Sequence, residues 1–103
     1  MQLGELQKSH SLFQERNAEI VALVVEPQAS VVALAKRYGY PYPVLADTDH
    51  AVSEAYGVYN LFNDKRAAPS VFVVDESGLV TWVYVGQNVN DRPAVQRVLN
   101  QLP

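Results

Sequence analysis

The stretch that decides the fold is "EIVALVVEPQASVVALAKRYGYPYPVLAD", residues 19–47. It opens on the segment "EIVALVVE", 19–26, whose unbroken apolar run between two glutamates is typical of a strand covered on both faces in a parallel sheet. Pro27 ends this run, and apolar positions at helical spacing follow until Gly39. A short apolar segment, 44–46, predicts a second strand. This strand–helix–strand order predicts a right-handed crossover in an α/β layer fold.

The segments that flank this stretch predict further helices. Upstream, residues 3–16 combine spaced apolar positions with good helix formers, which predicts one amphipathic helix. Downstream, a helix is predicted over 49–56, and residues 58–68 form a loop or an irregular hairpin. Three side chains near its start can cap the downstream helix: Asp47, Thr48 and Asp49.

The C-terminal third begins with "AAPSVFVVDESGLVTWVYVG", residues 67–86. Two apolar segments around a turn at 75–78 predict a β-hairpin. Pro69 stands where the first of these strands begins, a place that tolerates the missing N–H of proline. Asp91 is predicted to cap a last helix over 92–102.

Length and composition are those of one globular domain. The chain has 103 residues, of which 49% are apolar and 18% are charged, so a single domain over 1–103 is expected. The predicted fold class is α/β, with a central sheet flanked by helices.

Charge and hydropathy disfavour several classes of partner. The net charge is −3 and the 8 basic residues are scattered, which disfavours nucleic acids and anionic membranes. No apolar run approaches the roughly 18 residues of a membrane span. The N-terminal segment "MQLGELQKSH" is unlike a signal peptide, and we expect a soluble, cytoplasmic protein.

The sequence holds few residues of the kinds that carry chemistry. It has 0 cysteines, so it offers neither a thiol nucleophile nor a thiolate ligand. His10 and His50 are its 2 histidines and lie far apart. His50 follows Asp47 and Asp49, but the segment lacks a calcium-loop pattern, so helix capping is favoured over metal binding. We predict no catalytic residue, no metal and no cofactor on this chain.

Two features have alternative interpretations. The tyrosines at 38–42 and 56–59 could form a ligand platform, although core or half-buried rings are favoured. Arg66 precedes Pro69 by three residues. It is either a solvent-exposed loop arginine or a guanidinium that stabilises an anion beside the proline.

Several segments together resemble the redoxin and peroxiredoxin superfamily, in its alkyl hydroperoxide reductase/thiol-specific antioxidant group. They are "YPVLAD" at 42–47, "AYGV" at 55–58, and the apolar strand, Gly turn, aromatic strand and "DRP" of 70–93. The resemblance covers nearly the whole chain and implies a thioredoxin-like fold. It also implies that Pro69, after Ala68, is the cis proline beside the reactive cysteine, and that Arg66 lines the same site.

The departure from this family concerns its catalytic residue. Family activity depends on a cysteine at the start of the first helix, whereas the helix predicted at 3–16 carries none. The resemblance therefore implies an N-terminally short domain, inactive by itself, that lacks the family's first strand and its cysteine. That strand would lie between the counterparts of 19–26 and 70–75. Without it these two strands either pair with each other or keep unpaired edges, and we expect a homodimer or a swapped assembly.

Three hypotheses follow. The first is a part of a redoxin oxidoreductase that, when complete, reduces peroxides or disulfides with a thiol reductant as partner. The second is a non-catalytic thioredoxin-fold binding or assembly module. The third is an unrelated α/β ligand-binding domain, which a trans Ala68–Pro69 bond together with a sheet order unlike thioredoxin would favour.

Overall fold

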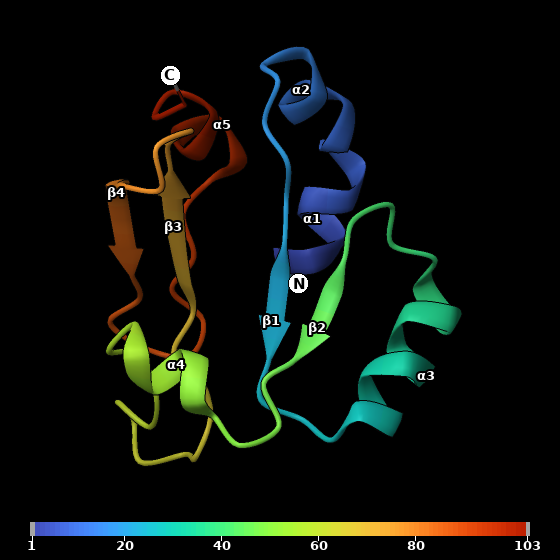
Figure 1. Cartoon of the computed structure of the whole chain (residues 1–103), viewed down its shortest axis with the longest axis vertical. Helices are drawn as coiled ribbons and strands as arrows, with labels where there is room; N and C mark the ends of the chain where they lie inside the picture. The colour runs from blue at the N-terminus through green and yellow to red at the C-terminus, as the bar shows by residue number, and fades with distance from the viewer. Residues whose placement is uncertain (1, 103) are drawn as a thin grey trace.

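A computed structural model describes residues 2–102 of the chain. Helices and short strands alternate along it (Figure 1). The elements are α1 (Gln2–Lys8), α2 (His10–Glu15), β1 (Ala22–Val24), α3 (Gln28–Tyr38), β2 (Val44–Ala46), α4 (Ala51–Ala55), β3 (Ser70–Val74), β4 (Val80–Val85) and α5 (Val95–Leu99).

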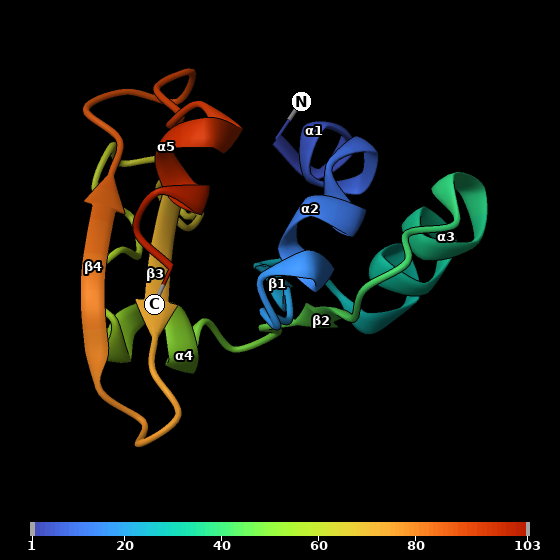
Figure 2. The same ribbon diagram turned by 90° about the horizontal axis from the view of Figure 1, so that it is seen from above.

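The strands form two separate two-stranded sheets. β1 and β2 are parallel, with Leu23 opposite Leu45, and β3 and β4 are antiparallel, with Phe72 opposite Val83. Figures 1 and 2 both place the strands across the molecule in the order β4, β3, β1, β2. The predicted strand–helix–strand unit is therefore present, and β1 and β3 are the two inner strands.

The core lies between the helices and one face of the strands. Phe13 of α2 packs with Val98 and Leu99 of α5, and each of the three is at most 5% exposed. Val71 and Trp82 of the hairpin pack against this cluster. The opposite face of β3 carries Phe72, whose ring meets the edge of Tyr56 just after α4. The hairpin thus has elements on both of its faces.

The hairpin confirms the prediction for residues 67–86. Its turn is closed by the carboxylate of Asp75, which accepts hydrogen bonds from the Ser77 and Leu79 amides at 2.9 Å and from the Ser77 hydroxyl at 2.6 Å. Gly78 has a φ of 88°, a conformation that favours glycine. The predicted irregular hairpin at 58–68 is present as a bridge between Tyr59 and Ala67.

The strand predicted over 19–26 is shorter and less covered than expected. β1 comprises Ala22–Val24 because its partner β2 has only three residues, between Pro43 and Asp47. Leu23 is 44% exposed and Leu45 is 49% exposed, so one face of this parallel pair is open. The prediction of a strand buried on both faces was wrong here, because an apolar run reports propensity for a strand and not the presence of neighbours.

Two helix predictions also need correction. The helix expected at 3–16 is broken at Ser9, which has a φ of −103° and a ψ of 9°. The last helix is α5, which is shorter than 92–102, and it begins after Ala94. Asp91 does not cap it: its carboxylate accepts hydrogen bonds from the Tyr84 hydroxyl at 2.5 Å and the Gln87 amide at 2.8 Å. This carboxylate is therefore hydrogen-bonded to β4 and to the loop that follows β4, and not to α5.

Candidate functional site

Ala68 and Pro69 directly precede β3, the inner strand of the hairpin. Ala68 is buried, and its amide donates to the Val58 carbonyl at 2.8 Å. The Pro69 carbonyl accepts from the Gly86 amide at 2.7 Å. Proline thus stands at the first residues of the hairpin, as its position in the sequence predicts. Backbone hydrogen bonds to Val58 and Gly86, which belong to two different loops, thus hold Ala68 and Pro69 in place.

The peptide bond Ala68–Pro69 is trans, since no cis bond occurs among the described residues. The cis bond implied by the resemblance was therefore wrong for this chain. A trans X–Pro bond is favoured by roughly 0.5–1 kcal/mol unless the surroundings impose the other isomer. Here the flanking groups, the Ala68 amide and the Pro69 carbonyl, both have backbone partners in the trans form.

Arg66 belongs to an exposed loop of unusual backbone geometry. Its amide donates to the Asp64 carboxylate at 3.2 Å, and its carbonyl accepts from the Asn60 amide at 2.7 Å. Asn60, Asn63 and Lys65 all have φ between 56° and 58°, in the left-handed region. These hydrogen bonds fix the backbone of Arg66, which precedes Ala68 by two residues. The side chain of Arg66 is exposed.

Asp47 is a buried carboxylate that joins β2 to α4. It is 4% exposed, and its oxygens accept from the Val52 amide at 3.1 Å and from the Ser53 amide and hydroxyl at 2.7 Å each. Burial acts to raise the pKa of this carboxyl, but the bonds from Ser53 and Val52, with His50 nearby, outweigh it and lower the pKa. The capping role predicted for Asp47 is confirmed, and it is structural.

His50 lies at the start of α4 but makes no side-chain cap hydrogen bond. Its φ of 52° is left-handed, its ring stacks on Tyr59 at 3.9 Å between centroids, and its Nδ1 is 2.9 Å from a Glu54 carboxylate oxygen. Among the described residues there is no cluster of three or more side chains able to hold a metal ion. The helix-capping role predicted for His50 is thus taken by Asp47.

The tyrosines form two separate sets of contacts. Tyr38, Tyr40 and Tyr42 form a column, with centroids 5.8 Å and 5.6 Å apart. Tyr42, the inner ring, is buried and donates to the Leu3 carbonyl at 2.6 Å. Burial, and then its neighbour Tyr40, raise the pKa of Tyr42 to about 12. Tyr56 and Tyr59 lie elsewhere, against Phe72 and His50. The tyrosines in the described part of the chain therefore do not gather into a single platform.

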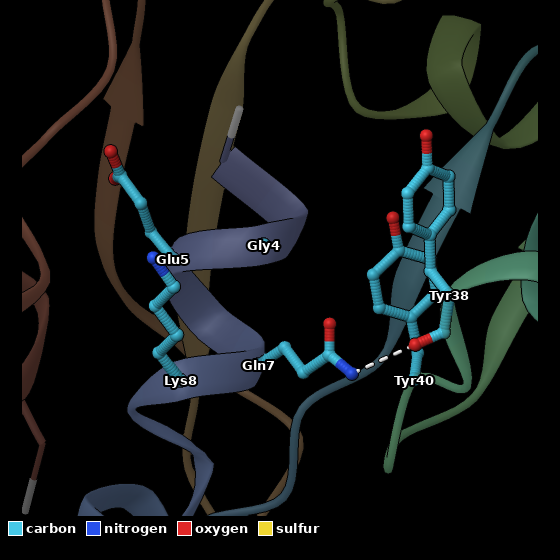
Figure 3. Close-up of a pocket in the computed structure, with 6 residues that line it drawn as sticks. All are labelled: Gly4, Glu5, Gln7, Lys8, Tyr38 and Tyr40. Atoms are coloured by element: carbon cyan, nitrogen blue, oxygen red, sulfur yellow. Dashed lines mark hydrogen bonds between the residues drawn. The ribbon is translucent and has the colours of Figure 1, made fainter.

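A hollow of about 320 Å³ lies beside the outer end of this column (Figure 3). Its lining includes Gly4 and Gln7 of α1 together with Tyr38 and Tyr40. The Gln7 amide points toward the tyrosines and donates to the Tyr38 carbonyl at 2.9 Å, which ties α1 to the end of α3. Nothing in the sequence pattern singled out Gln7, because a glutamine at this spacing is an ordinary helix former.

Another contact that the sequence did not predict lies between α5 and the core-facing side of the hairpin. The Arg97 guanidinium of α5 lies 5.1 Å from the centroid of Tyr84 and 6.0 Å from that of Trp82. The hydrogen bond from Tyr84 lowers the pKa of Asp91. These residues pin the loop after β4 to α5. The only sequence signal for them is the aromatic spacing of β4, which does not identify a partner.

No helix in the described part of the chain is long and apolar enough to cross a membrane.

Comparisons with known proteins point to one family. Residues 1–83 match the AhpC/TSA family. A thiol-disulfide oxidoreductase ResA from Geobacillus thermodenitrificans is 32% identical over 78 residues, which are 75% of this chain and 41% of that protein. The chloroplastic peroxiredoxin Q of Triticum aestivum is 27% identical over 79 residues, which are 77% of this chain and 36% of that protein. This chain thus spans less than half of each relative.

Solved structures give the fold. Mycobacterium tuberculosis AhpC superposes with a TM-score of 0.83 over 97% of this chain and 57% of its own, at 23% identity. Enterococcus faecalis AhpC does so with a TM-score of 0.83 over 96% and 61%, at 22% identity. The fold is therefore thioredoxin-like α/β, as the resemblance implied. The match of residues 1–83 to the AhpC/TSA family overturns the third hypothesis, an unrelated α/β domain. That hypothesis required a sheet order unlike thioredoxin as well as a trans proline, and only the trans proline is present.

Proposed function

The chain belongs to the AhpC/TSA family, and from this membership we propose that it is the cysteine-free part of a redoxin or peroxiredoxin-like thiol oxidoreductase. The complete protein would reduce peroxides or disulfides, with a thiol reductant as electron donor, and the chain by itself is inactive. One observation carries the proposal: the family match extends over residues 1–83 in a sequence with 0 cysteines. The thiolate is the nucleophile in such reactions, so this chain lacks the reacting atom.

The proposal assigns the shaping of the substrate site to Ala68, Pro69 and Arg66. Ala68 and Pro69 are held in place by the Val58 carbonyl and the Gly86 amide. Arg66, two residues before Ala68 in the chain, adds an exposed, permanently charged guanidinium, a group suited to an anion or a polarised oxygen. None of the three would react itself. They would position the substrate against a thiolate supplied by the complete protein.

Peroxide consumption in the presence of a dithiol tests the proposal. The chain as given is expected to consume no peroxide above the buffer rate. A form extended through an in-frame upstream cysteine should be active, and the same extended form with that cysteine changed to serine should be inactive. A coding sequence without such a cysteine, or an extended form without activity, would refute the oxidoreductase assignment.

The role of Arg66 can be tested in the extended form. Arg66→Ala should reduce the peroxidase rate about tenfold, which corresponds to roughly 1.4 kcal/mol of transition-state stabilisation. Arg92→Ala is the matched control, because Arg92 is also an exposed loop arginine and its side chain donates to the Val89 carbonyl. Equal rates for the two variants would remove Arg66 from the site.

The alternative is a non-catalytic thioredoxin-fold binding or assembly module. Exposed apolar side chains on the parallel pair, Leu23 and Leu45, favour it, as do the unpaired edges of β1 and β3. Under either hypothesis we expect the isolated chain to form a homo-oligomer through these surfaces. Light scattering at micromolar concentration tests this expectation, and a strictly monomeric species would count against it.

A further inference from the structure

The hollow beside the tyrosine column is bordered by a glycine that the packing of the fold does not require. Gly4 lies inside α1, where glycine weakens a helix relative to alanine. A Cβ added at Gly4 would meet no atom from the rest of the described chain within 4 Å, so no packing contact explains the missing side chain. Glycine also occurs where a ligand must approach the backbone closely. Gly4 therefore leaves bare helix backbone as one wall of the hollow.

The side chain of Gln7 presents a free acceptor beside the same wall. Its Nε2 lies 2.9 Å from the Tyr38 carbonyl oxygen and 3.4 Å from the Gly39 carbonyl oxygen. Because both partners are acceptors, the NH₂ end of the amide must face them and Oε1 must point the other way. Figure 3 shows Oε1 turned away from the Tyr38 carbonyl. Within residues 2–102 no group donates a hydrogen bond to this oxygen.

Two phenol rings line the hollow opposite α1. Tyr38 and Tyr40 have ring centroids 5.8 Å apart and ring planes 30° apart. In Figure 3 both hydroxyls point to the same side as Oε1 of Gln7. Neither hydroxyl has a hydrogen-bond partner in the described part of the chain, unlike the hydroxyl of Tyr42. This wall thus combines apolar ring surface with two hydroxyls that can each donate or accept.

Charge and volume narrow the class of occupant. Glu5 and Lys8 also line the hollow, but their charges are opposite, and Figure 3 shows both on the side of α1 away from the tyrosines. The Arg37 guanidinium lies 5.4 Å from the Tyr38 centroid and disfavours a cation at this place. An anion would meet the Gln7 carbonyl oxygen, which cannot donate. A volume of about 320 Å³ is at the low end for ligand pockets and suits one small ring system.

We propose that this hollow binds an uncharged planar heteroaromatic ring of the nucleobase type. The ring would lie between the bare backbone at Gly4 and the ring of Tyr40, with an N–H donating to Oε1 of Gln7. Its ring nitrogens would accept from the two tyrosine hydroxyls. Nucleobases combine a flat π-face with donors and acceptors along one edge, which is what these groups require. The site uses no thiol, so this inference goes beyond the proposed function and does not depend on it.

Adenine binding followed by NMR tests the proposal on the chain as it is. Adenine is uncharged at neutral pH and carries an N–H donor beside ring acceptors. We expect it to shift the backbone amides of Gly4 and Gln7 saturably, with a dissociation constant of about 1 mM or below. Indole is the control probe, because it is flat and donates once but has no ring acceptor. It should bind about tenfold more weakly, in line with the loss of one net hydrogen bond.

Gly4→Ala separates the site from the stability of the fold. The added methyl group meets no atom from the rest of the described chain and should raise the midpoint of thermal unfolding by about 2–8 °C. It should nevertheless weaken adenine binding at least tenfold, because it enters the hollow. Ser11→Ala is the matched control, since Ser11 is exposed on α2 and does not line the hollow. It should leave adenine affinity unchanged, whereas Tyr40→Leu should weaken it about tenfold.

Several outcomes would overturn the proposal. Adenine affinity that survives Gly4→Ala would mean that nothing approaches this backbone, and a lower unfolding midpoint would mean that the fold itself requires the glycine. Equal affinity for indole and adenine would reduce the site to an apolar surface, and unchanged spectra in saturated adenine would remove it altogether.

Adenosine 5′-monophosphate distinguishes two sources of the same ring. Binding as tight as that of adenine would identify a nucleotide, and weaker binding would identify the free base; both results support the proposal. Because peroxide consumption is not measured in these experiments, an extended form without peroxidase activity would refute only the proposed function.

Discussion

The antiparallel hairpin and the parallel pair differ in what holds them together. β3 and β4 are joined by a short turn in which Asp75 binds the following residues, and their inner face packs on α5. β1 and β2 meet across a helix and a tyrosine-rich loop, pair over only three residues, and leave Leu23 and Leu45 half exposed. The hairpin forms between residues that are close together in the sequence. The parallel pair instead depends on neighbouring elements to extend its strands and to cover its faces.

Leucine truncation should separate the two halves most clearly. Leu99→Ala removes a side chain that is 5% exposed against the hairpin, and should lower the free energy of unfolding by about 2–5 kcal/mol. Leu45→Ala removes one that is 49% exposed on the parallel pair, and should cost about 1 kcal/mol or less. Urea denaturation followed by circular dichroism measures both. Equal losses would mean that the open face of the parallel pair is covered in solution.

The connection between the parallel pair and the hairpin half can be weakened at Asp47. Asp47→Ala removes three hydrogen bonds to Val52 and Ser53 at the start of α4, and should cost about 1–2 kcal/mol. Asp49→Ala is the matched control in the same loop, because within residues 2–102 the Asp49 side chain accepts only one exposed hydrogen bond, from the Ala51 amide at 3.3 Å. It should cost about 0.5 kcal/mol or less. If both variants lose equal stability, the buried carboxylate has no special role.

The sequence predicted the local elements better than the long-range ones. The turn at Asp75, the start of β3 at Pro69 and the cap at Asp47 all follow from residues within a few positions of one another. The predicted length of β1 and the cis form of Pro69 failed because they depend on segments distant in the chain. The cap at Asp91 failed for a local reason, because Tyr84 and Gln87 donate to its carboxylate instead. The exposed side chain of Arg66 fits the loop interpretation, and its role in a site remains a prediction.

Acid should weaken the parallel half through Asp47. The pKa of this carboxyl is lower in the folded chain than its ordinary value of 3.8, so its stabilisation is present above pH 3.8 and is lost as pH falls through the lowered value. Asp47→Asn should be less stable than the parent chain at pH 7. The free energies of unfolding of Asp47→Asn and of the parent chain should converge below pH 3.8. The pKa of Asp75 in the hairpin is also lowered by its bonds to Ser77 and Leu79, so Asp75→Asn serves as the parallel test in the other half. If the difference in free energy of unfolding between Asp47→Asn and the parent chain stayed constant with pH, the charge of Asp47 would not be the source of its stabilisation.

Alkali should act on the parallel half through Tyr42, and this effect should be the smallest. Tyr42 donates to the Leu3 carbonyl, and its pKa is raised by burial to about 12. A raised pKa means that the phenol stabilises the fold fully below its ordinary value of 10.0, and that this stabilisation is lost as pH rises toward 12. Tyr42→Phe should cost about 0.5–1.5 kcal/mol at neutral pH, the range of one net hydrogen bond. Between pH 10 and pH 12, the free energy of unfolding of Tyr42→Phe should fall less than that of the parent chain. Tyr38→Phe is the control, because this ring is 45% exposed at the open end of the same column. If Tyr38→Phe changed the alkaline transition as much as Tyr42→Phe, the anchoring bond to α1 would not be its cause, and the tyrosine column as a whole would stabilise the parallel half.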